Sequence, residues 1–228
     1  RGLGDVYKRQ VKSIVIVGGS SDIAKSTISS ISTENYKFHA LVRDDSHTDE
    51  LSDLGVNVIL GDATSEEDIK NFISGVKESG EIHAILHCVG SFAVRPPHAM
   101  NKEAFEAVIS TNLTSAFLTL SIAGKAMLSQ GHGRMVFMSS VAGSLGLVNH
   151  EAISAAKGGI ESMVRSAAAT YANRGLRINA VAPGLTDTKL ASPIMSNETA
   201  SQAASQKIPV KRVGTVSYTH LRAHETGY

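Results

Sequence analysis

Short apolar runs alternate with longer amphipathic segments from residue 13 to residue 184, and this alternation limits the fold more than any other feature. Six runs are rich in β-branched or aliphatic residues, and they lie at 13–19, 37–42, 56–60, 82–90, 134–140 and 176–184. Five segments between them have helical spacing, and they lie at 22–32, 46–54, 66–78, 101–130 and 151–173. This pattern predicts an α/β fold, a doubly wound parallel sheet with helices on both faces. The segment 185–208 is polar and loop-like, and we expect a flap there.

The composition is that of one soluble domain. A chain of 228 residues with 42% hydrophobic content is long enough to bury a full core. Cys88 is the single cysteine, so it forms no intramolecular disulfide, and we expect it to be a small buried residue on a strand. No apolar stretch approaches the ~18 residues of a membrane span, which predicts a cytoplasmic protein without a membrane partner.

The two ends differ from the rest of the chain. Residues 1–10 and 216–228 lack an apolar period and resemble translated sequencing-adapter sequence, so we treat both as non-native segments. The domain is then expected at 11–215. The 22 basic and 21 acidic residues nearly balance, which argues against a nucleic-acid partner. We assign no metal site.

A glycine-rich turn joins the first expected strand to the first expected helix. Its sequence, VGGSSDIA at 17–24, lets backbone amides approach a pyrophosphate at a helix N-terminus. In a parallel sheet, ligands bind at the carboxyl ends of the strands, where this turn lies. A plain connection between strand and helix is the alternative interpretation.

This turn resembles the TGxxxGxG motif of the short-chain dehydrogenase/reductase family. Gly18 is kept, whereas Asp22 replaces the middle glycine and Ala24 the last. The resemblance implies a Rossmann-type fold and a nucleotide site, whose first residues are Gly18, Ser20, Ser21, Asp22 and Ile23. The Asp22 carboxylate stands near the phosphate path, but we expect it to cap the following helix.

The end of the second expected strand has the sequence LVRDD at 41–45, and it indicates which nicotinamide cofactor the chain binds. In the family, an acidic residue at the position of Val42 selects NAD, and an arginine at the next position binds the 2′-phosphate of NADP. Arg43 occupies that next position, so the resemblance implies NADP. A surface ion pair between Arg43 and Asp44 or Asp45 is the alternative.

Further matches follow at later strand ends. Asp62 and Ala63 stand where the family places an aspartate against the adenine. HCVG at 87–90 replaces the usual NNAG, so that Gly90 alone is kept. Asn112 matches the family's helix asparagine, and its carboxamide is placed to hold a carbonyl at a helix kink and a water.

The catalytic stretch lacks one expected group. Ser140 matches the serine that holds the substrate oxygen, and Lys157 matches the lysine that holds the nicotinamide ribose. The family places a tyrosine between them, but residue 153 is isoleucine and all five tyrosines lie elsewhere. In the family this tyrosine protonates the alkoxide that hydride transfer leaves, a contribution of roughly 10²–10⁴-fold. Another proton donor is therefore required.

His150 is our candidate for that donor, because histidine transfers protons near neutral pH. Glu151 is also near, and a surface histidine at a helix start is the simpler interpretation. Farther on, APGLTDT at 182–188 resembles the family's segment against the nicotinamide carboxamide, which implies contacts from Pro183, Gly184, Thr186 and Thr188.

The resemblance covers about residues 12–215, and the family's last strand and glycine-rich C-terminal segment are missing. It implies an NADP-dependent oxidoreductase that acts on a small carbonyl or alcohol, with a non-standard proton donor, and a homodimer or homotetramer at full length. The alternative is an inactive nucleotide-binding protein with a regulatory or assembly role. Residues 91–100 and 185–208 are expected to line the substrate pocket, although neither identifies the substrate.

Overall fold

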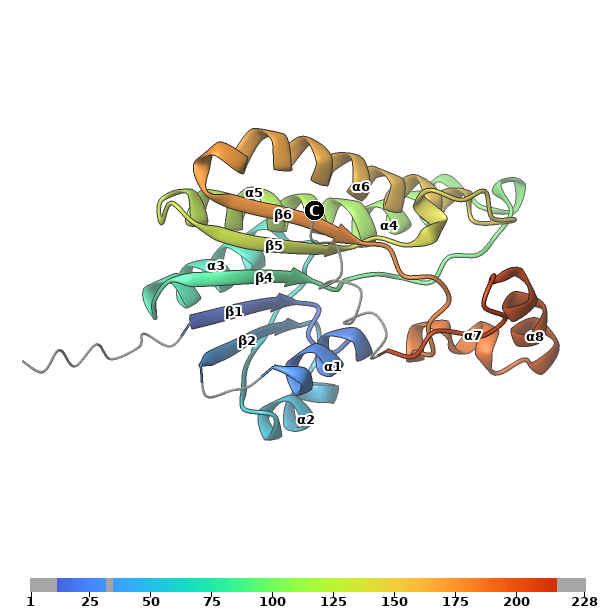
Figure 1. Ribbon diagram of the computed structural model, residues 1–228, viewed down its shortest axis with the longest axis horizontal. Coiled ribbons are helices and arrows are strands. Elements are labelled where there is room, and N and C mark those ends of the chain that lie inside the picture. Colours follow the sequence, from blue (N-terminus) through green and yellow to red (C-terminus); the bar gives the residue numbers. More distant parts are fainter. Residues whose placement is uncertain (1–11, 32–34, 217–228) are drawn as a thin grey trace, which may run out of the picture.

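The computed structural model describes residues 12–31 and 35–216. Residues 1–10 and 217–228, which belong to the two segments predicted to be non-native, lie outside this range. The residues described contain one parallel sheet with helices on both of its faces (Figure 1). The predicted Rossmann-type α/β fold is therefore confirmed.

Six strands form the sheet: β1 Lys12–Val17, β2 Tyr36–Val42, β3 Val56–Leu60, β4 Ile82–His87, β5 Gly133–Met138 and β6 Leu176–Val181. Their spatial order is β3-β2-β1-β4-β5-β6, and each neighbouring pair is parallel. The chain moves outward from β1 in one direction and from β4 in the other. Such a reversal opens a crevice at the carboxyl ends of the two central strands, and this is where ligands bind in sheets of this kind.

Eight α-helices are described: α1 Asp22–Ser30, α2 Thr48–Asp53, α3 Glu66–Glu78, α4 Lys102–Ile109, α5 Ser115–Leu128, α6 Glu151–Tyr171, α7 Ser192–Met195 and α8 Glu198–Lys207. Residues of α1 and α2 pack on one face of the sheet around Ile16 and Phe38. Residues of α3, α5 and α6 pack on the other face around Val15 and Phe137. β1, β2, β3 and β4 thus send side chains into both apolar clusters, whereas β5 and β6 contribute to the second cluster.

Four strands end earlier than predicted, and the residues after them form loops at the crevice. β1 ends at Val17, β4 at His87, β5 at Met138 and β6 at Val181. Cys88 therefore follows its strand instead of lying on it, and it is only partly buried by exposed area. The prediction of Cys88 on a strand was wrong by one residue.

The segment 185–208 is largely helical, so its prediction as a loop was wrong. It contains a 3₁₀ turn at Lys189–Ala191 followed by α7 and α8, which extend beyond the carboxyl ends of the strands (Figure 1). Its serine, glutamine and alanine residues leave little apolar face to reveal a helical period. Polarity here indicates exposure to water, not irregular backbone.

One continuous helix, Lys102–Leu128, is long and apolar enough to span a membrane by length and composition. The prediction that no such stretch exists was therefore wrong. Of its most apolar window, 44% is buried inside the protein, and α5 contributes Ala116, Leu120, Ala123 and Met127 to the core under the sheet. Its apolar character is thus accounted for by packing against the rest of the domain.

Candidate active site

The glycine-rich turn lies against the loop that follows β4. Gly18 has a φ of +86°, and a Cβ there would lie 2.9 Å from the backbone nitrogen of Val89. A Cβ on Gly19 would lie 2.6 Å from the Cβ of Ala40. Only glycine fits both positions, because one needs the left-handed region and both leave no room for a side chain. The turn thus brings the start of α1 to the crevice.

Ser21, not Asp22, caps α1. The Ser21 hydroxyl accepts a hydrogen bond from the amide of Ala24 at 3.1 Å, whereas Asp22 is the first residue of the helix. The Asp22 carboxylate instead accepts from the amide of Lys189 at 2.6 Å, across 167 residues of sequence, and lies 3.7 Å from the ammonium of Lys25. The prediction of Asp22 as the cap was therefore wrong. These partners compensate the negative charge that Asp22 places near the turn.

Ser20 and Ile23, the other residues predicted to lie at this turn, are both partly exposed. Gly18 and Ser21 are also partly exposed. The N-terminus of α1, with its partial positive charge, is therefore open to a ligand from the crevice side.

Arg43 is exposed directly after β2, and Val42 before it is buried. Within the described residues no ion pair joins Arg43 to Asp44 or Asp45. The carboxylate of Asp44 accepts from the amide of Ser46 instead, at 3.1 Å. The alternative of a surface ion pair is therefore not realised, and the guanidinium faces solvent.

Asp62 lies at the end of the neighbouring strand. Its carboxylate accepts from the amide and the hydroxyl of Thr64, both at 2.8 Å. These bonds lower the pKa of Asp62, and the positive charge of Arg43 acts in the same direction. Ala63 beside it is buried. Arg43 and Asp62 therefore influence one another at the ends of β2 and β3.

Gly90, Asn112 and Lys157 come together in the crevice. A Cβ on Gly90 would lie 3.3 Å from Oδ1 of Asn112 and 3.6 Å from Nζ of Lys157. Asn112 is fully buried in a π-helical segment, Ser110–Thr114, between α4 and α5. Its amide nitrogen donates to the carbonyl of Val108 at 2.9 Å and to the Ser91 hydroxyl at 2.8 Å. The predicted contact between Asn112 and a carbonyl at a helix kink is thus present.

The Lys157 ammonium is buried, with 7% of the residue exposed. Its Nζ donates to the carbonyl of Met138 at 2.9 Å. Burial lowers the pKa of Lys157 to about 8, and the neighbouring Cys88 opposes this change. Lysine carries three N–H groups when charged, so two remain for other partners. Lys157 is thus a stronger acid than an ordinary lysine.

Backbone bonds fix the loop that carries Ser140. The amide of Ser139 donates to the carbonyl of Val181 at 2.7 Å, and the amide of Val141 donates to that of Pro183 at 3.0 Å. The partly buried Ser140 accepts from the amide of Ala142 at 3.2 Å. The structure therefore brings Ser140 beside the Pro183–Gly184 segment.

Glu161 of α6 secures the same loop, and the sequence interpretation missed it. Its carboxylate accepts from the hydroxyls of Ser139 at 2.9 Å and Ser144 at 2.8 Å, on either side of Ser140. Glu161 lies four residues after Lys157 and so on the same helix face, which is the one signal that could have identified it. Charge-assisted bonds of this kind are strong and hold the loop in one position.

Ile153 lies in an apolar cluster with 8% of its area exposed. Its neighbours include Val108, Ala142 and Ala156, so its environment offers no proton. His150 precedes α6, and its Nδ1 lies 2.7 Å from the carbonyl oxygen of Val148. Seven residues separate His150 from Lys157, or about 10 Å along the helix axis. Within the described residues, no hydrogen bond links His150 to the cluster around Lys157.

Residues 183–188 form the remaining wall of the crevice. Thr186 is buried, and its hydroxyl donates to the carbonyl of Gly184 at 3.2 Å. Thr188 caps the next turn by accepting from the amide of Ala191 at 3.3 Å. Because Lys189 bonds to Asp22, this segment is tied to the start of α1.

His87, at the end of β4, is fully buried below the cluster. Its Nε2 lies 3.1 Å from the Ser115 hydroxyl, and within the described residues its Nδ1 has no hydrogen-bond partner. Burial lowers the pKa of His87 to about 3, and the charge of Lys157 contributes. The imidazole is therefore neutral. The sequence interpretation gave His87 no role, since burial of this kind is a tertiary property.

Comparison with known proteins shows that the chain is similar in sequence to reductases. Residues 18–219 match a family model described as enoyl-(acyl carrier protein) reductase. A 3-oxoacyl-[acyl-carrier-protein] reductase, MabA of Mycobacterium tuberculosis, is 30% identical over 205 residues, which cover 90% of this chain and 80% of that protein.

Solved structures of other proteins have the same fold as this chain. Levodione reductase superposes with a TM-score of 0.87 at 25% identity, covering 93% of this chain and 89% of that one. ElxO, solved with NADP bound, superposes with a TM-score of 0.85 at 24% identity, covering 95% of this chain and 92% of that one. At 24% identity, the similarity to ElxO shows a shared fold alone.

Proposed function

Because this chain belongs to the short-chain dehydrogenase/reductase family, we propose that it transfers a hydride between NADP(H) and a small carbonyl or alcohol substrate. The observation that carries the proposal is the convergence of Gly90, Asn112 and Lys157 next to the Ser140 loop. These groups come from three separate stretches of the chain. A fold alone does not require them to meet, whereas a carbonyl-reducing site does.

The residues present fit a dinucleotide. Gly18 and Gly90 lie close against Val89 and Asn112, where a Cβ would be 2.9 Å and 3.3 Å away, and the N-terminus of α1 is open to a pyrophosphate. The solvent-facing Arg43 supports NADP over NAD, since its guanidinium is free to pair with a 2′-phosphate. When bound, NADPH supplies the hydride. Asp62 and Ala63 would lie at the adenine end, and Pro183, Gly184, Thr186 and Thr188 at the nicotinamide end.

The chain's own residues hold and orient the substrate. The Ser140 hydroxyl would donate to the carbonyl oxygen, in a loop that Glu161 and Pro183 keep in place. Asn112 holds the Val108 carbonyl and Ser91, which fixes the wall behind Lys157. Such fixed donors favour the charge that develops on the oxygen, because they need not reorganise during the reaction.

A proton must still reach the alkoxide, and Ile153 has none. We assign this step to the Lys157 ammonium, directly or through one water, because its lowered pKa makes it a better acid at the site of reaction. His150 is the alternative donor. An imidazole can transfer a proton, but His150 stands about 10 Å farther along α6. The two candidate proton donors can be distinguished by experiment, because His150→Gln removes the imidazole and leaves Lys157 intact.

The competing function is nucleotide binding without turnover. The apolar surroundings of Ile153 favour it, because a buried cluster of alanine and valine neighbours excludes water from the tyrosine position. The intact Lys157 cluster opposes it, since regulation or assembly needs no buried ammonium beside a serine loop. A buried lysine destabilises the folded protein, and a role in catalysis would explain why it is present.

We also propose that the chain forms a homodimer or homotetramer. Phe105 of α4 and Phe117 of α5 are exposed by 41% and 56%, although large apolar side chains are usually covered. The long helices of this family pair between subunits, as the sequence resemblance implies. Light scattering after size exclusion tests the assembly, and a monomer at all concentrations would contradict it.

The activity is tested with NADPH and a panel of aldehydes and ketones. We expect slow NADPH oxidation by the unaltered protein, and roughly 10²–10⁴-fold faster oxidation by Ile153→Tyr, which restores a phenol one helical turn before Lys157. Activity that is constant below about pH 8 and falls above it would support Lys157 as the acid. If the unaltered protein binds NADPH but never oxidises it, while Ile153→Tyr does, the proposal of an active enzyme fails.

A further inference from the structure

The hydrogen bond between Asp22 and Lys189 reaches across the crevice. Asp22 is the first residue of α1, which follows β1, whereas Lys189 lies on the chain that follows β6. In the sheet, β4 and β5 lie between β1 and β6, so these two strands are three strand spacings apart, or about 14 Å. The chain after β6, residues 182–189, therefore crosses the carboxyl ends of β5 and β4 to reach α1 (Figure 1). We call these residues the strap.

Two sets of contacts hold the strap beyond the sheet. Near its middle, the amide of Asp187 donates to the carbonyl of Gly214, and the amide of Gly214 donates to the carbonyl of Leu185, both at 2.9 Å. At its end, Lys189 is the first residue of a 3₁₀ turn, a position whose amide has no acceptor inside the turn. The Asp22 carboxylate supplies that acceptor at 2.6 Å. Asp22 thus provides the contact that joins the strap to α1.

The Asp22 carboxylate is held in place on its own side of the crevice. The Lys25 ammonium lies 3.7 Å from Oδ1 of Asp22 and 3.0 Å from the carboxylate of Glu50 in α2. The bond to Lys189 uses the other oxygen of Asp22, Oδ2. The strap can therefore detach from α1 while Asp22 keeps its position. The family's motif has glycine here, which has no carboxylate, so this bond is a feature of this chain.

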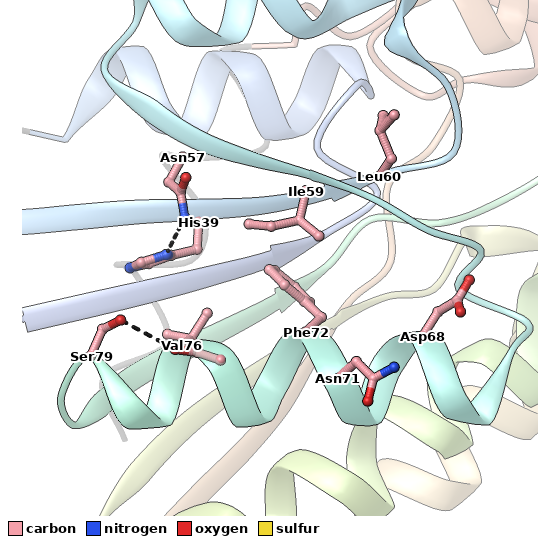
Figure 2. Close-up of a pocket in the computed structure, with 10 residues that line it drawn as sticks. His39, Asn57, Ile59, Leu60, Asp68, Asn71, Phe72, Val76 and Ser79 are labelled. Atoms are coloured by element: carbon pink, nitrogen blue, oxygen red, sulfur yellow. Dashed lines mark hydrogen bonds between the residues drawn. The ribbon is translucent and has the colours of Figure 1, made fainter.

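The end of the crevice that we propose for the adenine is built from local contacts instead. The amide of Asp62 donates to the carboxylate of Asp68 at 2.7 Å, and Figure 2 shows Asp68 in the first turn of α3. The two residues are six positions apart and connect β3 to the helix that follows it. This end therefore belongs to one βα unit, whereas the strap comes from a distant part of the sheet.

We propose that the bond between Asp22 and Lys189 is a latch that closes the strap over bound NADP(H) and limits the rate at which the cofactor leaves. With the latch formed, the strap covers the pyrophosphate at α1 and keeps Thr186 and Thr188 at the nicotinamide end. Opening of such a segment often precedes ligand release in enzymes. Asp22 is thus a positioning residue that acts through the Lys189 amide. The proposal rests on the proposed function only in that NADP(H) binds in this crevice.

The test measures dissociation of NADPH from the full-length protein by stopped-flow fluorescence, with excess NADP⁺ as the displacing ligand. Asp22→Ala removes the acceptor and should raise the dissociation rate about tenfold or more. Asp22→Asn removes the charge but keeps an oxygen that accepts from the Lys189 amide, so dissociation should remain slow. Repulsion between the carboxylate and the phosphates would be relieved equally in both variants, so this pair separates the latch from a charge effect.

A second pair of variants changes the donor. Lys189→Pro removes the N–H, and proline suits the first position of the turn because Thr188 before it is extended, with a φ of −143° and a ψ of 160°. Lys189→Ala keeps the N–H and is the matched control. We expect about tenfold faster dissociation or more from Lys189→Pro, and no further increase when it is combined with Asp22→Ala, because both remove the same bond.

Hydrogen exchange in the protein without cofactor gives an independent readout. The Lys189 amide should exchange faster in Asp22→Ala than in Asp22→Asn. Equal NADPH dissociation rates in Asp22→Ala and Asp22→Asn, or in Lys189→Pro and Lys189→Ala, would overturn the latch and leave the proposed function standing. The measurement needs no turnover, so a failure of hydride transfer would not alter its result. Absence of NADPH binding by the unaltered protein would overturn the proposed function and the latch together.

Discussion

Acid should destabilise this protein through His87. The imidazole is fully buried, with its Nε2 beside the Ser115 hydroxyl and its Nδ1 without a partner among the described residues. Burial, together with the Lys157 charge, lowers the pKa of His87 from 6.5 to about 3. The folded protein therefore holds this ring neutral at pH values where the unfolded chain already protonates it.

The direction and the size of the pH effect on stability follow from this difference in pKa between the folded and unfolded states. Between about pH 6.5 and pH 3 the unfolded state binds more protons at this residue, so the free energy of unfolding falls as the pH falls. The contribution of His87 is complete above pH 6.5 and is lost progressively toward pH 3. At about 1.4 kcal/mol per pH unit, acidification from about pH 7 to about pH 4 removes about 3 kcal/mol through His87 alone.

Urea unfolding of the unaltered protein and of His87→Asn at both pH values measures this effect. Asparagine does not titrate, and it is the residue that the family resemblance implies at this position. The loss of stability between the two pH values should therefore be about 3 kcal/mol smaller in the variant. His98→Asn, at an exposed histidine, should behave like the unaltered protein. Equal losses in His87→Asn and the unaltered protein would refute the account of a neutral buried ring.

Three further substitutions test individual contacts. Arg43→Ser should weaken NADPH binding by about 10- to 100-fold and leave NADH binding unchanged, as fluorescence titration would reveal, because one charge-assisted contact is lost. Glu161→Gln should lower kcat about tenfold while the KM for NADPH stays the same, since the carboxylate holds the Ser140 loop and not the cofactor; an unchanged kcat would contradict this. Asp22→Ala should speed hydrogen exchange of the Lys189 amide about tenfold or more, because its acceptor is removed; equal exchange rates would show that this bond does not tie the segment down.

The sheet was predictable because its signal is local. Every predicted strand is present, since each run is short and rich in β-branched or aliphatic residues, and the run at 56–60 is bounded by Gly55 and Gly61. The helices at 66–78 and 151–173 were equally plain, because their apolar period is long. The helices after residue 189 were missed, since an exposed helix has almost no apolar period.

The candidate site was predictable only at positions where a single residue type matches a sequence motif of the family. Gly18, Gly90 and Asn112 match the family's motifs in sequence, and their contacts in the structure explain why those residue types are needed. The partner of Asp22 was not predictable, because Lys189 is 167 residues away and only the fold brings the two together. For the same reason the roles of His87 and Glu161 emerge from burial and tertiary contacts.

The most direct test of the central claim is hydride transfer by the unaltered protein. NADPH that carries deuterium at the transferred position is mixed with a carbonyl substrate, and mass spectrometry of the product alcohol detects the label. The account predicts labelled alcohol from the unaltered protein and at least tenfold less from Ser140→Ala, which lacks the hydroxyl that holds the carbonyl. Absence of labelled alcohol from protein that binds NADPH, when Ile153→Tyr produces it, would contradict the claim that this site works without a tyrosine.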